Sequence, residues 1–69
     1  MDIPWTDGFE ISVKSENGEV IISANKEGLL SLSRQLAALA DEKCGSHIHY
    51  DEYNSLEAGS SQLIIVKAD

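Results

Sequence analysis

The sequence predicts a small α+β domain in which four antiparallel strands form a single sheet and one helix packs on one face of that sheet. Three observations support this fold class. Strand-like runs with alternating apolar residues flank one longer segment of helical periodicity, an Asn-Gly pair separates the first two runs, and 69 residues can enclose only one thin core of two layers. We expect a single domain at 1–69 with the element order β-β-α-β-β, and we expect residues 1–8 to be a loose arm.

The first two predicted strands form a β-hairpin. Residues 9–14 (FEISVK) alternate between apolar and polar side chains, which is the period of a half-buried strand. Asn17 and Gly18 suit the positive φ angles of a tight turn, and residues 19–24 (EVIISA) form the returning strand.

A helix of about four turns is expected next. Asn25 can cap its start, and Gly28 in the first turn should weaken that start by up to ~1 kcal/mol relative to alanine. Gly45 is expected to end the helix, after Lys43 has complemented its dipole. The face that we expect to cover the sheet consists of the apolar residues at helical spacing, namely Leu29, Leu32, Leu36, Leu39 and Ala40.

The last two predicted strands cover residues 46–50 (SHIHY) and 62–67 (QLIIVK), and residues 51–60 connect them. The second and fourth strands are the most apolar, so we place them at the centre of the sheet, in the spatial order 1-2-4-3. The sheet face away from the helix would then carry an aliphatic strip formed by Ile21 and alternate residues of the last strand, either Leu63 with Ile65 or Ile64 with Val66. Apolar patches with polar rims are common interaction surfaces, so Ile21 is a candidate for contact with a partner.

The chain is acidic, with a net charge of −7 and a pI of about 4.5. Phosphate backbones and anionic membranes repel such a surface, so neither nucleic acid nor a membrane is expected as a partner. A basic protein partner fits this charge, although negative charge can also serve solubility alone. The start of the chain lacks the pattern of a signal peptide and Cys44 is the one cysteine, so we expect a cytoplasmic protein without disulfides.

His47, His49 and Asp51 recur at every second residue, which places them on one side of an extended strand. This spacing suits two imidazole ligands and a carboxylate for zinc, or an imidazole pair that responds to pH. Metal sites usually recruit ligands from several elements, so we favour a polar strand face that hydrogen-bonds to a partner. No metal or other cofactor is assigned.

The connecting loop is acidic and contains Asp51, Glu52 and Glu57. Such a lobe is either simply solvated or a docking surface for basic side chains, with Tyr53 and Leu56 as its apolar anchors. The sequence contains neither a nucleophile elbow nor a glycine-rich phosphate loop, and nothing fixes the geometry of a general acid–base pair. We therefore expect that this chain is not an enzyme.

Three stretches resemble the immunity protein 32 family of bacterial polymorphic toxin systems. They are ISANKEGLLSLSRQLAALA at residues 22–40, the His-x-His-x-Asp strand, and the Leu-x-x-Gly-Ser…Leu-Ile-Ile ending, which together span roughly residues 20–67. The resemblance implies a protein that binds and neutralises a cognate toxin domain, often a nuclease, as in contact-dependent inhibition. It implies no catalytic residues.

Two function classes therefore stay open: an immunity protein that binds a toxin domain, basic where the two meet, and a homo-oligomeric structural or regulatory module that pairs through its open sheet face or an edge strand. A third class, a small metal-dependent enzyme, would require bound metal and turnover. The candidate partner-binding residues are Asp51, Glu52, Tyr53, Glu57, His47, His49 and Ile21.

Overall fold

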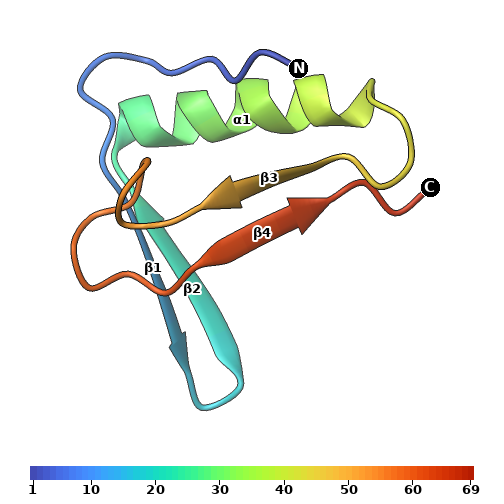
Figure 1. Cartoon of the computed structure of the whole chain (residues 1–69). Coiled ribbons are helices and arrows are strands. Elements are labelled where there is room, and N and C mark those ends of the chain that lie inside the picture. The colour runs from blue at the N-terminus through green and yellow to red at the C-terminus, as the bar shows by residue number, and fades with distance from the viewer.

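One helix and four strands follow one another in the predicted order in the computed structural model, which describes all 69 residues (Figure 1). The strands are β1 (Ile11–Glu16), β2 (Glu19–Ala24), β3 (His47–Tyr50) and β4 (Leu63–Val66), and helix α1 (Lys26–Ala40) connects β2 to β3. The α+β class is thus confirmed. The helix is neither long enough nor apolar enough to span a membrane.

Both pairs of consecutive strands form antiparallel hairpins. Asn17 and Gly18 have φ angles of 49° and 80° and close the turn between β1 and β2, which confirms the prediction from the Asn-Gly pair. In the second hairpin, His49 lies opposite Ile64 across the strand pair.

The two hairpins do not join into the single four-stranded sheet that we expected, and the order 1-2-4-3 is wrong. The β3–β4 sheet runs along α1, whereas the β1–β2 hairpin projects away from the start of the helix (Figure 1). The outer edge of β1, not of β2, meets the segment before β4: the N–H groups of Glu57 and Ser61 donate to the carbonyls of Ile11 and Val13 over 2.9 and 2.8 Å. The apolar run of β2 therefore forms an outer strand.

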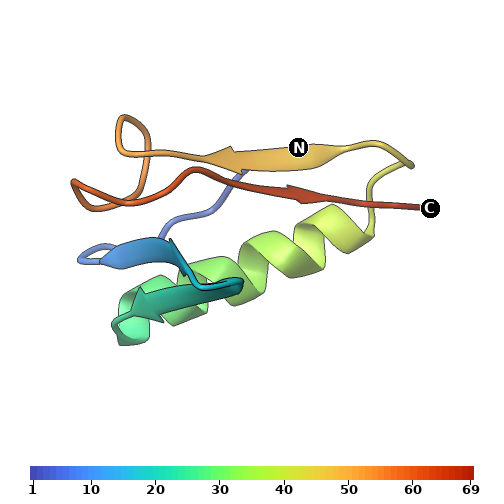
Figure 2. The ribbon, with the colours of Figure 1, turned by 90° about the horizontal axis from the view of Figure 1, so that it is seen from below.

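The core lies between α1, the inner face of β3–β4 and the N-terminal half of β1. Figure 2 shows α1 and the β3–β4 sheet as two layers, with the β1–β2 hairpin beside the first turns of the helix. The buried apolar side chains are Ile11, Val13, Leu39, Ile48, Tyr50 and Leu56. Leu56, expected as an anchor for a partner, is thus a core residue.

The buried side of α1 is rotated away from the leucine stripe that we expected. Gly28, Ser31, Gln35 and Leu39 are buried. Of the predicted stripe, Leu39 is therefore in the core and Leu32 packs against it, whereas Leu29, Leu36 and Ala40 are exposed. Ser31 and Gln35 can point inward because the N-terminal arm and Tyr50 bind their polar atoms. No buried side-chain nitrogen or oxygen lacks a hydrogen-bond partner.

The N-terminal arm, which we expected to be loose, lies along α1 (Figure 1). The Thr6 N–H donates to Ser31 Oγ over 2.8 Å, and Gln35 Nε2 donates to the Pro4 carbonyl over 2.7 Å. The indole of Trp5 stacks on the ring of Phe9 with 4.3 Å between ring centroids, and it covers one end of the core.

The ends of α1 are determined by different local contacts. Asn25 caps the start as predicted, because its Oδ1 accepts the Gly28 N–H over 2.8 Å. The helix ends at Ala40, several residues before Gly45, and no basic residue lies in its last turn. Gly45 instead has a φ of 89° in the turn that leads to β3.

Burial of Tyr50 should make the protein less stable at alkaline pH. Loss of solvation raises the pKa of this phenol above its ordinary value of 10.0. The unfolded chain therefore loses the proton at a lower pH than the folded protein does, so the contribution is complete below pH 10 and is lost as pH rises through the folded pKa.

Urea unfolding at pH 8 and at pH 11 measures this effect. The unfolding free energy should fall less from pH 8 to pH 11 in Tyr50→Phe than in the parent. Tyr53→Phe is the control, because Tyr53 is solvent-exposed, and its unfolding free energy should fall as much as that of the parent. An equal fall in Tyr50→Phe and the parent would contradict the assignment.

Candidate functional site

The loop at residues 51–60, which holds most of the predicted partner-binding residues, is closed by its own acidic side chains. The Asp51 carboxylate accepts the N–H groups of Tyr53 and Asn54 over 2.9 and 3.0 Å. Glu52 Oε2 accepts the Gly59 N–H over 2.8 Å. Asp51 and Glu52 therefore shape the loop, and this restricts their freedom to contact a partner.

Tyr53 and Glu57 project from this loop without such restraint. The Tyr53 side chain is 94 % exposed, which is unusual for a large aromatic residue. The Glu57 backbone is bonded to β1, but its side chain is exposed and borders a shallow hollow of about 290 Å³ that Glu10 also lines. The most accessible predicted residues are thus an aromatic ring and a carboxylate.

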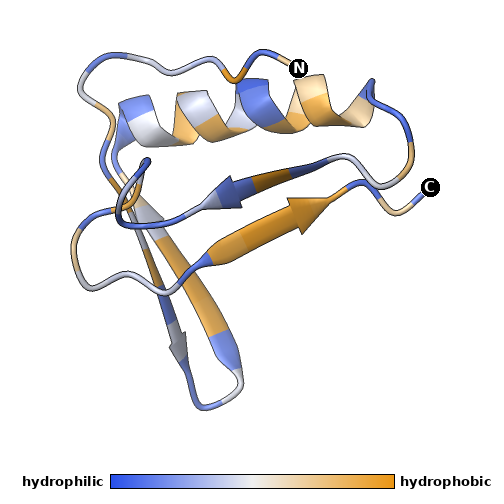
Figure 3. Cartoon of the chain, viewed as in Figure 1, coloured by the Kyte–Doolittle hydropathy of each residue, from blue (hydrophilic) through white to orange (hydrophobic).

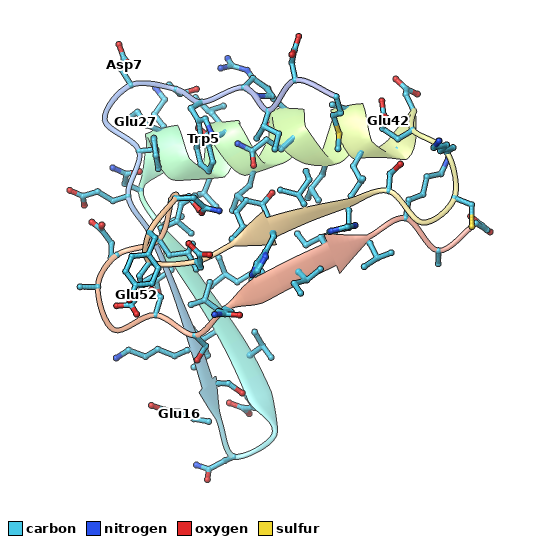
Figure 4. All side chains as sticks on the ribbon, viewed as in Figure 1. Trp5, Asp7, Glu16, Glu27, Glu42 and Glu52 are labelled. Carbon is cyan, nitrogen blue, oxygen red and sulfur yellow. The ribbon has the colours of Figure 1, made fainter.

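Acidic residues from distant parts of the sequence gather around this loop. Asp7, Glu27 and Glu52 lie at the same end of the molecule, while Glu42 and Glu16 lie at the far end of α1 and near the hairpin tip (Figure 4). We call this region the acidic end, and it consists of Asp7, Glu10, Glu27, Asp51, Glu52 and Glu57. Two basic residues border it: Lys26 is the first residue of α1, and Arg34 donates to Thr6 Oγ1, next to Asp7, over 2.7 Å.

His47 and His49 lie exposed on β3, and the structure does not bring them together with Asp51 as a ligand set. The Asp51 carboxylate binds the backbone of its own loop. No group of three or more His, Cys, Asp or Glu side chains is arranged to hold a metal ion. Val66 and Ile64 lie opposite the two histidines and are likewise exposed, so the outer face of β3–β4 combines imidazole and aliphatic groups.

The aliphatic strip predicted on one open face is divided between the two sheets. Of the two alternatives for β4, Ile64 with Val66 is the exposed pair, whereas Leu63 and Ile65 pack against the core. Ile21 is exposed on β2, opposite Lys14, in the other sheet. Hydropathy colouring shows β2 and β4 as separate apolar strands (Figure 3).

Sequence reasoning missed a second apolar surface, because it assigned those residues to the core. Val20 and Ile22 on β2 and Leu29 and Leu36 on α1 are all exposed. The available signal was Ser31 and Gln35, which are spaced four residues apart, as helix neighbours are, and therefore compete with the leucines for the inner side.

Comparison with known proteins identifies one relationship. The sequence model of a protein family described as immunity protein 32 matches residues 19–68, from the start of β2 to beyond the end of β4. No curated protein and no solved structure matches the chain.

Proposed function

The chain belongs to the immunity protein 32 family, and from this membership we propose that it binds and neutralises a cognate bacterial toxin domain. Neutralisation occurs through non-covalent contact in the cytoplasm and requires no catalysis by this chain. The family match, which includes α1 and three of the four strands, is the observation that carries the proposal.

We place the toxin contact at the acidic end. A toxin that acts on nucleic acid has a basic substrate groove, and an acidic inhibitor of net charge −7 is attracted to such a groove over long range. The exposed Tyr53 side chain lies at the acidic end, and tyrosine is among the residues most often found in binding hot spots. We infer that Tyr53 inserts into the toxin while the carboxylates around it orient the complex.

The size of the molecule is compatible with this placement. Its accessible surface is 4696 Å², and a standard interface covers ~800 Å² on each partner. About a sixth of the surface is therefore sufficient, which one end of the molecule can supply.

The function itself is tested with the product of the gene that neighbours the gene for this chain, which we propose to contain the toxin domain. Expression of that domain alone should stop bacterial growth, and co-expression of this chain should restore it. The two purified proteins should form a complex in size-exclusion chromatography. Unrelieved toxicity together with no complex would reject the immunity function.

The placement at the acidic end is tested by Tyr53→Ala, measured by calorimetric titration with the same toxin domain. Loss of a hot-spot side chain costs about 2 kcal/mol or more, so affinity should fall at least about 30-fold. Because Tyr53 makes no side-chain contact that the fold requires, the unfolding midpoint should not change.

Glu57→Lys, in the same titrations, should weaken binding and reduce its dependence on salt, since this carboxylate faces the proposed partner. Glu16→Lys is the matched control, because it changes the charge equally near the hairpin tip, away from the acidic end (Figure 4). Equal effects of the two charge reversals, with full affinity in Tyr53→Ala, would place the toxin elsewhere while leaving the immunity function intact.

A further inference from the structure

The outer edge of β2 is open. In an antiparallel strand pair, every second residue forms no backbone hydrogen bond with the opposite strand. The N–H and C=O groups of these residues point away from the partner strand. On β1 these include Val13, whose N–H donates to Ser60 Oγ and whose carbonyl accepts the Ser61 N–H. Val13 lies opposite Ile22, and two residues along Ser15 lies opposite Val20, so the N–H and C=O groups of Ile22 and Val20 point outward on β2. No other segment of the chain bonds to them.

The side chains along this edge are aliphatic and exposed. Val20 is 62 % exposed, and Ile21 and Ile22 are each 43 % exposed. Leu29, which is 57 % exposed, and Leu36 lie on the flank of α1 that faces away from the N-terminal arm. Natural edge strands usually carry charges, proline or a bulge that prevents pairing, and β2 has only Glu19 at its first position.

The charge of this surface indicates its occupant. A basic partner finds one carboxylate on β2, that of Glu19, beside otherwise uncharged side chains. The acidic loop at residues 51–60 bonds to the other edge of this hairpin, because the Glu57 N–H donates to the Ile11 carbonyl of β1. Every other copy of the chain carries the same strand, in which Glu19 is the one charged residue. Two such strands meet without opposing their negative charges.

The sequence of β2 is self-complementary in antiparallel pairing centred on Ile21. Val20 of each copy then pairs with Ile22 of the other, so all four outward groups find partners, and the two Ile21 side chains meet at the two-fold axis. Glu19 lies opposite Ser23 of the second copy. The two Glu19 residues are four residues apart along the strands, about 14 Å at ~3.4 Å per residue, which exceeds the screening length of ~8 Å at physiological salt.

We propose that β2 is a dimerisation strand, through which two copies of this chain form a continuous four-stranded sheet in the order β1-β2-β2-β1. The pairing covers the exposed side chains of Val20, Ile21 and Ile22. It leaves the loop at residues 51–60 of each copy on the opposite edge of the hairpin, where Glu57 and Ser61 bond to β1. One short strand forms an interface at the small end of the range for specific complexes, so the dimer forms in a concentration-dependent way.

Sedimentation velocity of the purified protein at concentrations from about 1 μM to about 1 mM tests the proposal. This concentration range covers the dissociation constants of weakly associating dimers. The parent chain should shift from monomer to dimer. Val20→Lys places a charge inside the strand pair and should keep the protein monomeric throughout. Ile64→Lys is the matched control, because it makes the same kind of change at a 54 % exposed site on β4, and it should dimerise like the parent.

Amide hydrogen exchange gives an independent measurement. Exchange at Val20 and Ile22 should slow as the parent concentration rises, and in Val20→Lys exchange at Ile22 should not respond. Far-UV circular dichroism checks that both variants are folded. A parent chain that stays monomeric up to about 1 mM, a Val20→Lys variant that dimerises like the parent, or an Ile64→Lys variant that does not dimerise would overturn the proposal.

Discussion

Replacing Gln35 by alanine is expected to reduce the free energy of unfolding by at least about 3 kcal/mol. A chain of 69 residues has a total stability of roughly 3–10 kcal/mol, so this variant should be largely or partly unfolded at physiological temperature. The reason is the position of the Gln35 amide, which is fully buried and binds two other groups.

The amide connects three separate parts of the chain. Gln35 Oε1 accepts the Tyr50 hydroxyl over 2.7 Å, and Gln35 Nε2 donates to the Pro4 carbonyl over 2.7 Å. Truncation leaves the buried Tyr50 hydroxyl without a partner, which costs about 1–3 kcal/mol, and it removes the bond that holds the exposed Pro4 to the helix. It also removes side-chain volume from a buried position.

Thermal unfolding followed by circular dichroism measures the effect, and a fall in Tm of more than about 10 °C is expected. Gln62→Ala is the matched control, because it makes the same chemical change at an exposed position and should leave the Tm unchanged. If the two variants unfold at the same temperature, the Gln35 amide does not connect α1, β3 and the arm as described.

Gly28→Ala is expected to destabilise the protein, although helix propensity alone predicts a gain of up to ~1 kcal/mol. A Cβ atom at Gly28 would lie 2.7 Å from the Glu10 carbonyl oxygen and 2.9 Å from Ile11 Cγ1. The carbonyl cannot withdraw easily, because it accepts the Asn25 N–H over 3.1 Å. Overpacking of this kind costs about 1–3 kcal/mol, so we expect a net loss of stability.

The sign of the change separates the two effects. Ser33→Ala, at an exposed position of the same helix, meets no such close contact. The Ser33 hydroxyl bonds only to the Leu30 carbonyl of its own helix, so the gain in propensity should raise the unfolding free energy slightly. Chemical denaturation measures the change in unfolding free energy of each variant relative to the parent. A Gly28→Ala variant more stable than the parent would mean that α1 does not pack as closely on the β1–β2 hairpin as the structure shows.

Local signals in the sequence were sufficient for the elements themselves. The Asn-Gly pair and the alternation around it predicted the β1–β2 hairpin, and Asn25 predicted the start of α1. These features depend on the backbone preferences of neighbouring residues, so no distant contact was needed to recognise them.

The candidate site was predictable only in part, for a similar reason. The sequence identified an acidic loop with an exposed tyrosine, but it could not reveal that Asp51 and Glu52 bind the backbone of their own loop. Nor could it reveal that Glu10, distant in sequence, borders the same hollow as Glu57. The assignment of the acidic end as the partner-binding surface stays a prediction.

The amino-acid sequence by itself determined the acidity of the chain, the thin core that 69 residues allow, and the membership of the immunity protein 32 family. The tertiary structure alone decided which apolar residues are covered. The sequence of an apolar strand such as β2 does not show whether its own chain or another chain covers it. Hydropathy describes the preference of a side chain for an apolar environment, and not whether a neighbour is present. Here Gln35 hydrogen-bonds to Pro4 and Tyr50 inside the fold, and the aliphatic side chains of β2 are left facing solvent.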